Sequence, residues 1–370
     1  MHSLLFFAVI IWQFPKSPIS DLKPMPAPTQ NRLLFIDSIR GIAAVLVLFQ
    51  HSYEYFFREQ VEEIGHSVFH FGQAGVVAFF LVSGYIIPFS LERSSSLTSF
   101  FIHRIFRIYP LYLVILLINL LLVYSGIDHM EGEVNPFHIL FTHLFFVQEY
   151  LAGNWSLNLV VGSWTLFIEA IWYLIAAILF RFRLSHQMII NLAILGFLIL
   201  TIASVVLHIR LPLGRMGMLL HCVMGLHFYR RSQHLISSKS FIAYALALGV
   251  VQLAGLLVAY GYFSSDHFTA GCIMTSWTGA YALFLVFYVW NQTGNQFWDS
   301  VLSYLGSISY SLYLSHFTCI ILMDFVLGKT VSGFMATLFL TVLVSHFSYR
   351  LIEKPGIAFG KRITMKSSDA

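Results

Sequence analysis

The sequence contains few charged residues. Only 10% of its 370 residues are Asp, Glu, Lys or Arg, whereas a soluble domain carries about 25%. A chain with so few charges cannot cover a globular surface with solvated groups. Its formal net charge of +4 is also too small to indicate a nucleic-acid partner. This composition excludes an ordinary soluble enzyme.

Cysteine is scarce as well. The three cysteines, Cys222, Cys272 and Cys319, all lie in apolar runs and form no spaced pair. Neither a disulfide framework nor a zinc site is indicated, and we expect the three thiols to pack in the core. His66 and His70 have i, i+4 spacing but no clear third ligand. We therefore predict no metal site.

Long apolar runs are abundant. Hydrophobic residues make up 58% of the chain and the mean hydropathy is +0.77. A run of about 20 apolar residues can cross a bilayer as a helix. We predict an all-α, polytopic transmembrane helical bundle. Its ten expected spans are 33–55, 68–90, 106–126, 162–180, 187–207, 212–229, 241–263, 269–290, 301–323 and 331–351.

The segment 137–150 is short, and it could span, re-enter or lie at the interface. If it does not cross, most basic loops fall on one side of the membrane, and the positive-inside rule then places both termini in the cytoplasm. Arg210 and Lys329 are the exceptions. We expect 33–355 to form one membrane domain and 356–370 a cytoplasmic tail. We expect 1–32 to be disordered or to include residues before a later start at Met25.

Ionisable residues bracket the first predicted span. In "RGIAAVLVLFQH", Arg40 and His51 are separated by ten residues. On a helix they share one face, about 16 Å apart along the axis. Asp37 lies on the same face, three residues before Arg40. Arg40 could reach the interface and His51 could end the helix, but ionisable groups inside membrane helices are functional candidates by default.

Two other stretches carry charge beside or within an apolar run. In "HRIFRIYPLYLV", Arg104 and Arg107 share a helix face just before a predicted span that has Pro110 in its first turn. Planar guanidinium groups bind phosphates bidentately, although anchoring at the membrane surface is an alternative. In "GSWTLFIEAIWYL", Glu169 lies about two turns into a helix and needs a partner there.

Six motifs in order resemble the acyltransferase-3 family of integral-membrane O-acyltransferases. "DSIRGIAAVLVLFQH" resembles its first helix and "FFLVSGYII" its second. "RIFR" followed by "IYPLYL" is similar to its R-x-x-R and Y-P pattern. "SWTLFIEAIWYL", "SYSLYLSH" and "YRLIEKP" resemble later helices. The resemblance covers about 33–355.

This resemblance implies ten spans, a cytoplasmic acyl-CoA donor and an acceptor hydroxyl that is often on the far side of the membrane. It also implies that Arg40, His51, Arg104 and Arg107 matter most. The family often carries a second acid after the first, and a serine before it. This chain has Ala170 and Phe167 at those positions. Of these family residues, only the first acid is therefore present, as Glu169.

The sequence therefore predicts an O-acyltransferase, most simply an O-acetyltransferase, that moves an acyl group from acyl-CoA to a hydroxyl of a cell-surface polysaccharide or other glycan. We expect a bacterial inner membrane, no permanently bound cofactor and no nucleic-acid partner. His51 would act as general base or as acyl carrier. The rival hypotheses are a proton-coupled transporter or flippase and a receptor or scaffold without chemistry. The candidate residues are His51, Arg40 and Glu169 for catalysis, Arg104 and Arg107 for the donor, and Asp37, Ser83, Trp164, Tyr313 and His316 for binding or orientation.

Overall fold

The computed structural model describes residues 31–58, 68–128, 135–148, 158–263, 268–290 and 296–366. The predictions for 1–30 lie outside these residues. All regular secondary structure within them is helical. The elements are α2 (Asn31–Phe56), α4 (Phe71–Glu92), α5 (Leu97–Tyr124), α6 (Pro136–Leu144), α8 (Trp164–Arg181), α9 (His186–Val206), α10 (Leu213–Ser232), α11 (Ser238–Leu256), η2 (Leu257–Tyr262), α12 (Ala270–Trp290), α13 (Gln296–Leu327), α14 (Val331–Ser348), η3 (Tyr349–Glu353) and α15 (Lys354–Lys366).

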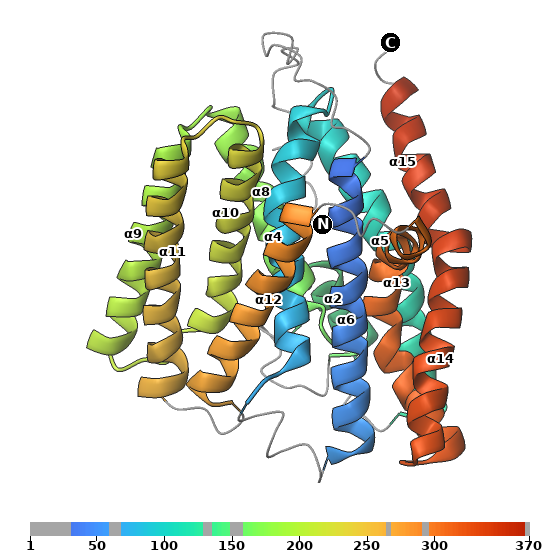
Figure 1. Ribbon diagram of the computed structural model, residues 1–370. Helices are drawn as coiled ribbons and strands as arrows, with labels where there is room; N and C mark the ends of the chain where they lie inside the picture. The colour runs from blue at the N-terminus through green and yellow to red at the C-terminus, as the bar shows by residue number, and fades with distance from the viewer. Residues whose placement is uncertain are drawn as a thin grey trace.

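The long helices form one bundle of roughly antiparallel rods (Figure 1). In the described part of the chain, nine helical stretches are long and apolar enough to cross a membrane, with η2 and η3–α15 counted as continuations of α11 and α14. Helix α10 is a further long helix beside them, made less apolar by Arg215, His221 and His227. The start of α2 and the end of α15 lie at the same end of the bundle, which is the upper end in Figure 1.

The centre of the bundle is the packing of α2 against α13 and α4, and of α4 against α10. Helices α4 and α10 cross at two glycines. A Cβ on Gly84 would collide with the carbonyl of Cys222, and a Cβ on Gly225 would collide with the carbonyl of Leu81. The two backbones touch because no side chain stands between them. All three cysteines are buried, as predicted.

Helix α5 begins earlier than predicted. Ser96 caps it by accepting a hydrogen bond of 3.0 Å from the backbone N–H of Ser99. Arg104 therefore lies inside the helix, and the placement of Pro110 in the first turn was wrong. Because Pro110 has no N–H, the carbonyl of Phe106 has no helical partner there. This carbonyl lies against Gly356 of α15, whose missing side chain allows the close approach.

The segment that contains α6 re-enters the bundle and does not cross it. Its nine helical residues span only about 14 Å. Its end packs against the middle of α5, where the hydroxyl of Tyr109 donates to the carbonyl of Leu144 (2.6 Å) and the hydroxyl of Tyr112 lies 2.7 Å from Nδ1 of His143. Helix α5 runs down from the upper end, and α8 runs back up. The described part of 137–150 thus reaches only the middle of α5 and does not cross the bundle.

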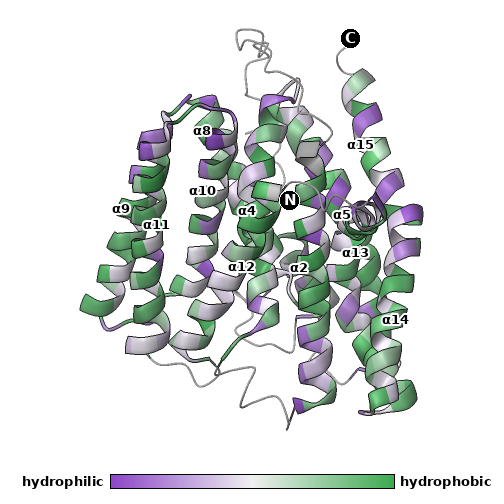
Figure 2. Ribbon diagram, in the orientation of Figure 1, coloured by the Kyte–Doolittle hydropathy of each residue, from purple (hydrophilic) through white to green (hydrophobic). Residues whose placement is uncertain are grey.

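The last helix continues beyond the predicted span at 331–351. Helix α14 leads through the π-helical turn η3 into α15, so one helical rod extends to Lys366. In Figure 2 hydrophilic residues appear along α15 and at the upper ends of α9 to α11, and hydrophobic residues cover most of the remaining length. Short π-helical turns inside α-helices often mark functional positions, and η3 ends at the buried Glu353.

Candidate functional site

The polar side chains inside the bundle form two groups. The upper cluster gathers charged and phenolic groups from α2, α5, α8 and η3. The lower cluster gathers imidazole, amide and carboxylate groups from α2, α13 and the residue that caps α4. The upper cluster is Arg40, Arg104, Arg107, Glu169, Tyr173 and Glu353. The lower cluster is Gln50, His51, Glu54, His70 and His316.

Arg40 enters the upper cluster from α2. Its Nη1 lies 4.0 Å from Oδ1 of Asp37, one turn earlier on the same helix, as the predicted face requires. The Arg40 charge also interacts with Arg107 from α5, Glu353 from η3 and Glu169 from α8. The structure therefore brings together charges from four helical elements that are far apart in the sequence.

Arg104 is held more firmly than its neighbour Arg107. Its Nη2 donates a 2.7 Å hydrogen bond to Oγ of Ser90, and its guanidinium lies over the rings of Phe100 (5.2 Å) and Tyr173 (5.5 Å). Its Nε is buried without a hydrogen-bond partner among the described residues. Arg107 makes no direct hydrogen bond to any residue that the structure describes, although its charge acts on Asp37, Arg40 and Glu353. Both guanidinium groups retain donors for an anion.

Glu169 has the partners that a carboxylate within the membrane requires. The hydroxyl of Tyr173 donates to its Oε1 at 2.5 Å, and Oγ of Ser83 donates to the same oxygen at 3.4 Å. The indole of Trp172 donates to the carbonyl of Ser83 at 3.3 Å, which fixes α8 against α4. Ser83 thus contacts Glu169, in addition to lying beside the glycine crossing.

Glu353 is the acid of "YRLIEKP". Its side chain is 1% exposed, and its Oε2 accepts a 2.9 Å hydrogen bond from Oγ of Ser311 on α13. Its charge interacts with Arg107 and Arg40. Glu353 lies at the end of the π-helical turn η3, inside the bundle. Its negative charge there faces the positive charges of Arg40 and Arg107.

The lower cluster is organised around Glu54. Its Oε2 lies 3.4 Å from Nδ1 of His51, and its Oε1 lies 2.9 Å from Nε2 of His70 and 3.0 Å from Nε2 of Gln50. His70 caps α4 by accepting a hydrogen bond from the backbone N–H of Gln73. Gln50 accepts one from the N–H of Phe71. The start of α4 therefore fixes the carboxylate that faces His51.

His51 and His316 meet at the contact between α2 and α13. Their rings stack with centroids 5.4 Å apart and planes 19° apart. Phe317 lies against both rings. The side chain of His51 is 31% exposed, whereas His316 is 1% exposed. One histidine is thus accessible at the lower end and the other is fully enclosed.

A row of hydroxyls and backbone groups links the two clusters. Nδ1 of His316 lies 2.6 Å from the carbonyl of Tyr313. The hydroxyl of Tyr313 donates to the carbonyl of Gly162 at 3.0 Å and lies 3.0 Å from Oγ1 of Thr165. Thr165 precedes Glu169 by four residues on α8, so it lies one turn away from the upper cluster. Tyr313 therefore contacts α8 one turn from Glu169, and His316, which stacks on His51, contacts the backbone of Tyr313.

Trp164, the remaining predicted residue, lies at the start of α8, where the guanidinium of Arg215 sits 5.4 Å over its ring. Sequence reasoning missed five further residues of the site. Glu54 follows His51 by three residues, and this i, i+3 spacing could have identified it. Gln50 and Tyr173 each lie four residues from their carboxylate partner on the same helix, a spacing that could have identified them. His70 and Glu353 were noted only for a spacing and a motif, because their partners come from other helices.

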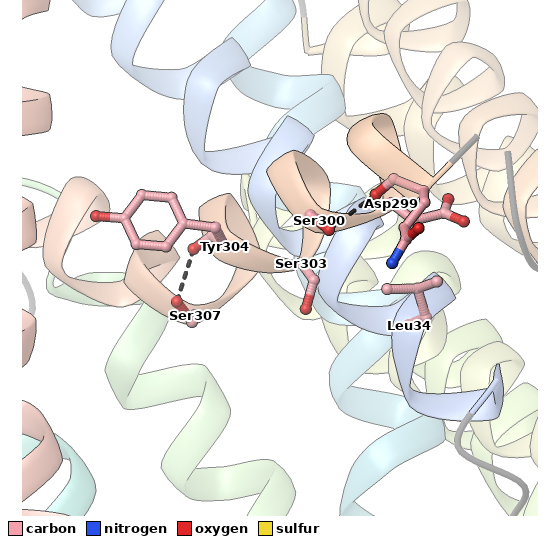
Figure 3. Close-up of a pocket in the computed structure, with 7 residues that line it drawn as sticks. Leu34, Asp299, Ser300, Ser303, Tyr304 and Ser307 are labelled. Atoms are coloured by element: carbon pink, nitrogen blue, oxygen red, sulfur yellow. Dashed lines mark hydrogen bonds between the residues drawn. The ribbon is translucent and has the colours of Figure 1, made fainter.

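A separate hollow lies between the upper ends of α2 and α13. It has a volume of about 580 Å³ and is lined by Leu34, Gln296, Asp299, Ser300, Ser303, Tyr304 and Ser307. Figure 3 shows the labelled lining residues on successive turns of α13, with Leu34 of α2 facing them. None of the site residues lines it. Among the described residues, no group of three or more His, Cys, Asp or Glu side chains could hold a metal ion.

Comparison with known proteins yields distant relatives, three of which are named as acyl- or acetyltransferases. The chain is 29% identical to acyltransferase MdmB of Streptomyces mycarofaciens over 162 residues, 42% of this chain and 41% of the relative. It is 28% identical to nodulation protein 10 of Rhizobium leguminosarum bv. viciae over 186 residues, 43% of this chain and 48% of the relative. The matches therefore span less than half the length of these two relatives.

A longer match is to an O-acetyl transferase of Shigella phage Sf6. It is 25% identical over 333 residues, which cover 86% of this chain and 94% of the relative. No solved structure matches the chain. The family model described as an acyltransferase domain matches residues 33–350, which include every residue of both clusters except Glu353. The resemblance inferred from the six motifs is thereby confirmed, and the chain belongs to the acyltransferase-3 family of membrane acyltransferases.

Proposed function

We propose that this membrane acyltransferase takes an acyl group from acyl-CoA in the cytoplasm and transfers it to a hydroxyl of a cell-surface polysaccharide or other glycan. The observation that carries the proposal is the pairing of an arginine-rich upper cluster with a histidine–carboxylate lower cluster, joined through Thr165, Tyr313 and His316. An acyl transferase needs a grip on its donor and a base or nucleophile at the reacting carbon.

The upper cluster suits the charged part of coenzyme A. Arg104 and Arg107 present guanidinium donors, and Arg40 lies beside them. Arginine binds phosphate oxygens bidentately, and such charge-assisted bonds are stronger than neutral ones. The rise of α2 from Arg40 to His51 is about 16 Å, which matches the order of length of an extended pantetheine arm. Donor phosphates at the arginines would therefore bring the thioester toward the histidines.

The lower cluster suits the chemical step. His51 has a carboxylate partner on one ring nitrogen, and imidazole is the side chain best matched to proton transfer near neutral pH. It would act as general base toward the acceptor hydroxyl or carry the acyl group as an intermediate. Glu169, Ser83, Trp164 and Tyr313 would orient the donor arm along the path between the clusters.

The distribution of basic residues supports a cytoplasmic upper end. Loops and helix ends there carry Arg93, Arg181, Arg183, Arg230, Arg231 and Lys239, and α15 adds Lys354, Lys361 and Arg362. Cytoplasmic loops are enriched in Lys and Arg. Both described ends would then lie in the cytoplasm of a bacterial cell, with the histidines opening toward the far side of its inner membrane. The name of the phage relative favours acetyl as the group transferred.

The direct test uses membranes, radiolabelled acetyl-CoA and a count of label in the cell-surface glycan fraction. Wild-type membranes should label the glycan, and Arg104→Ala/Arg107→Ala should lower kcat/KM at least about 100-fold, because each charge-assisted hydrogen bond contributes about 1.5–3 kcal/mol. The exposed pair Arg181→Ala/Arg183→Ala is the matched control and should stay within about twofold of wild type. Unlabelled glycan with wild type would contradict the proposal.

A further inference from the structure

The tautomer of His316 is set by its backbone contact. Its Nδ1 lies 2.6 Å from the carbonyl of Tyr313. A carbonyl oxygen can only accept, so Nδ1 carries the proton and donates it. A neutral imidazole has one N–H and one lone pair. The lone pair of His316 is therefore on Nε2.

That lone pair has no partner. Nε2 of His316 is buried and makes no hydrogen bond to any residue that the structure describes. Leaving a buried polar atom unpaired is costly, and each such atom in a native structure calls for an explanation. His316 stacks on the ring of His51, which is the residue proposed to carry out the chemical step. A substrate group that donates to Nε2 would satisfy it.

His51 is arranged differently. Its Nδ1 faces the Glu54 carboxylate at 3.4 Å, and this places the proton on Nδ1 and the lone pair on Nε2. A carboxylate behind an imidazole also stabilises positive charge on that ring. If Nε2 of His51 bonds to an acyl group while Nδ1 keeps its proton, the ring has no lone pair left. It cannot then also accept the proton of the incoming hydroxyl.

We propose that the two histidines divide the reaction, with His51 carrying the acyl group and Nε2 of His316 taking the proton of the acceptor hydroxyl. This inference rests on the proposed function and assigns the general base within it. In the sequence His316 could only be expected to orient His51 or to bind the acceptor. The stacking on His51 and the unpaired Nε2 are the observations that assign proton transfer to His316.

In the first step, Nε2 of His51 attacks the thioester carbon. The C–S bond breaks, and coenzyme A leaves as the thiolate with the bonding electron pair, to be protonated by solvent. The positive acyl-imidazole faces Glu54. In the second step, the acceptor oxygen bonds to the acyl carbon while its proton passes to Nε2 of His316. The C–N bond breaks, its electron pair returns to His51, and the proton on Nε2 of His316 passes to water that replaces the departing product.

The test separates the two half-reactions. One readout is the burst of coenzyme A released from acetyl-CoA without glycan, together with label retained on the protein. The other is the rate of glycan labelling when acceptor is present. His316→Asn is the sharpest variant, because its amide nitrogen can replace Nδ1 and keep the bond to Tyr313 while Nε2 is lost. His316→Gln instead places an amide oxygen near the Nε2 position, where it accepts a hydrogen bond but is no base.

Wild type should release about one equivalent of coenzyme A per chain in the burst and then label the glycan. His316→Asn and His316→Gln should retain the burst and the bound label, while glycan labelling falls at least about 100-fold, the usual contribution of a general base. The Gln variant should keep an acceptor KM nearer to wild type than the Asn variant. His51→Asn should show neither burst nor labelling.

His221→Asn is the matched control, since His221 is also buried with an unpaired Nε2 but lies on α10. It should retain both activities. Glycan labelling by His316→Asn within a few-fold of wild type would overturn the inference, as would loss of the burst in both His316 variants, because that would indicate structural support only. A wild type that labels no glycan and releases no coenzyme A would overturn the proposed function itself.

Discussion

Glu54 and His51 face each other one turn apart at the lower end of α2, with Oε2 of the carboxylate 3.4 Å from Nδ1 of the imidazole. The same carboxylate is fixed from α4 by His70 and from α2 by Gln50. This arrangement orients the ring and selects its tautomer, as the acid of a catalytic triad does. If His51 reacts as proposed, Glu54 is a positioning residue for it.

Glu54→Gln should lower glycan labelling about 100-fold or more. The Gln amide can donate to Nδ1 and move the ring proton to Nε2, which would remove the reactive lone pair. The expected signature is a fall in kcat with little change in KM for acyl-CoA, measured by initial rates. Asp324→Asn removes another carboxylate near the lower end, one that binds Tyr55, and should stay within a few-fold of wild type. Equal effects of the two variants would contradict the assignment.

Glu353→Gln should destabilise the protein by about 1–3 kcal/mol, since it removes a buried negative charge that opposes Arg40 and Arg107 while it keeps the bond to Ser311. The measurement is thermal unfolding in detergent, with Asp299→Asn as a control at the first turn of α13. An unfolding temperature for Glu353→Gln that matches the control would show that this charge does not balance the arginines.

Gly84→Val should destabilise the fold by about 3 kcal/mol or more, since its Cβ would meet the backbone of Cys222, which cannot move aside as a flexible side chain could. Gly196→Ala on α9 is the matched control. Its Cβ would have no atom within 4 Å, so it should leave stability unchanged or raise it by up to about 1 kcal/mol. The yield of folded protein and its unfolding temperature report both. A normally folded Gly84→Val would contradict the close crossing of α4 and α10.

The helices were predictable because each apolar run is long enough to cross a bilayer. The residues at which the helices begin and end were less predictable. Helix α5 begins at Leu97 and α13 covers Gln296–Leu327, against predicted starts at 106 and 301. Polar residues such as Arg104 interrupt the apolar pattern, yet they are accommodated inside the bundle by partners such as Ser90. Hydropathy alone cannot detect partners that come from another helix.

Several site residues were predictable from their motifs, but their geometry was predictable only within one helix. The 3.6-residue period placed Asp37, Arg40 and His51 on one face. The partner of Glu353 could not be anticipated, because it depends on a π-helical turn and on a serine from α13. The stacking of His316 on His51 likewise requires the packing of α13 against α2. The roles assigned to these residues remain predictions that the variants above test.

Sidedness and the role of His51 can be measured together in right-side-out membrane vesicles. Radiolabelled acetyl-CoA is enclosed within them, and glycan acceptor is supplied outside. We expect labelled glycan from wild-type vesicles with enclosed donor, none when the donor is supplied only outside, and none from His51→Asn at a matched protein level. Label from externally supplied donor, or wild-type labelling by His51→Asn, would contradict transfer from a cytoplasmic donor through His51.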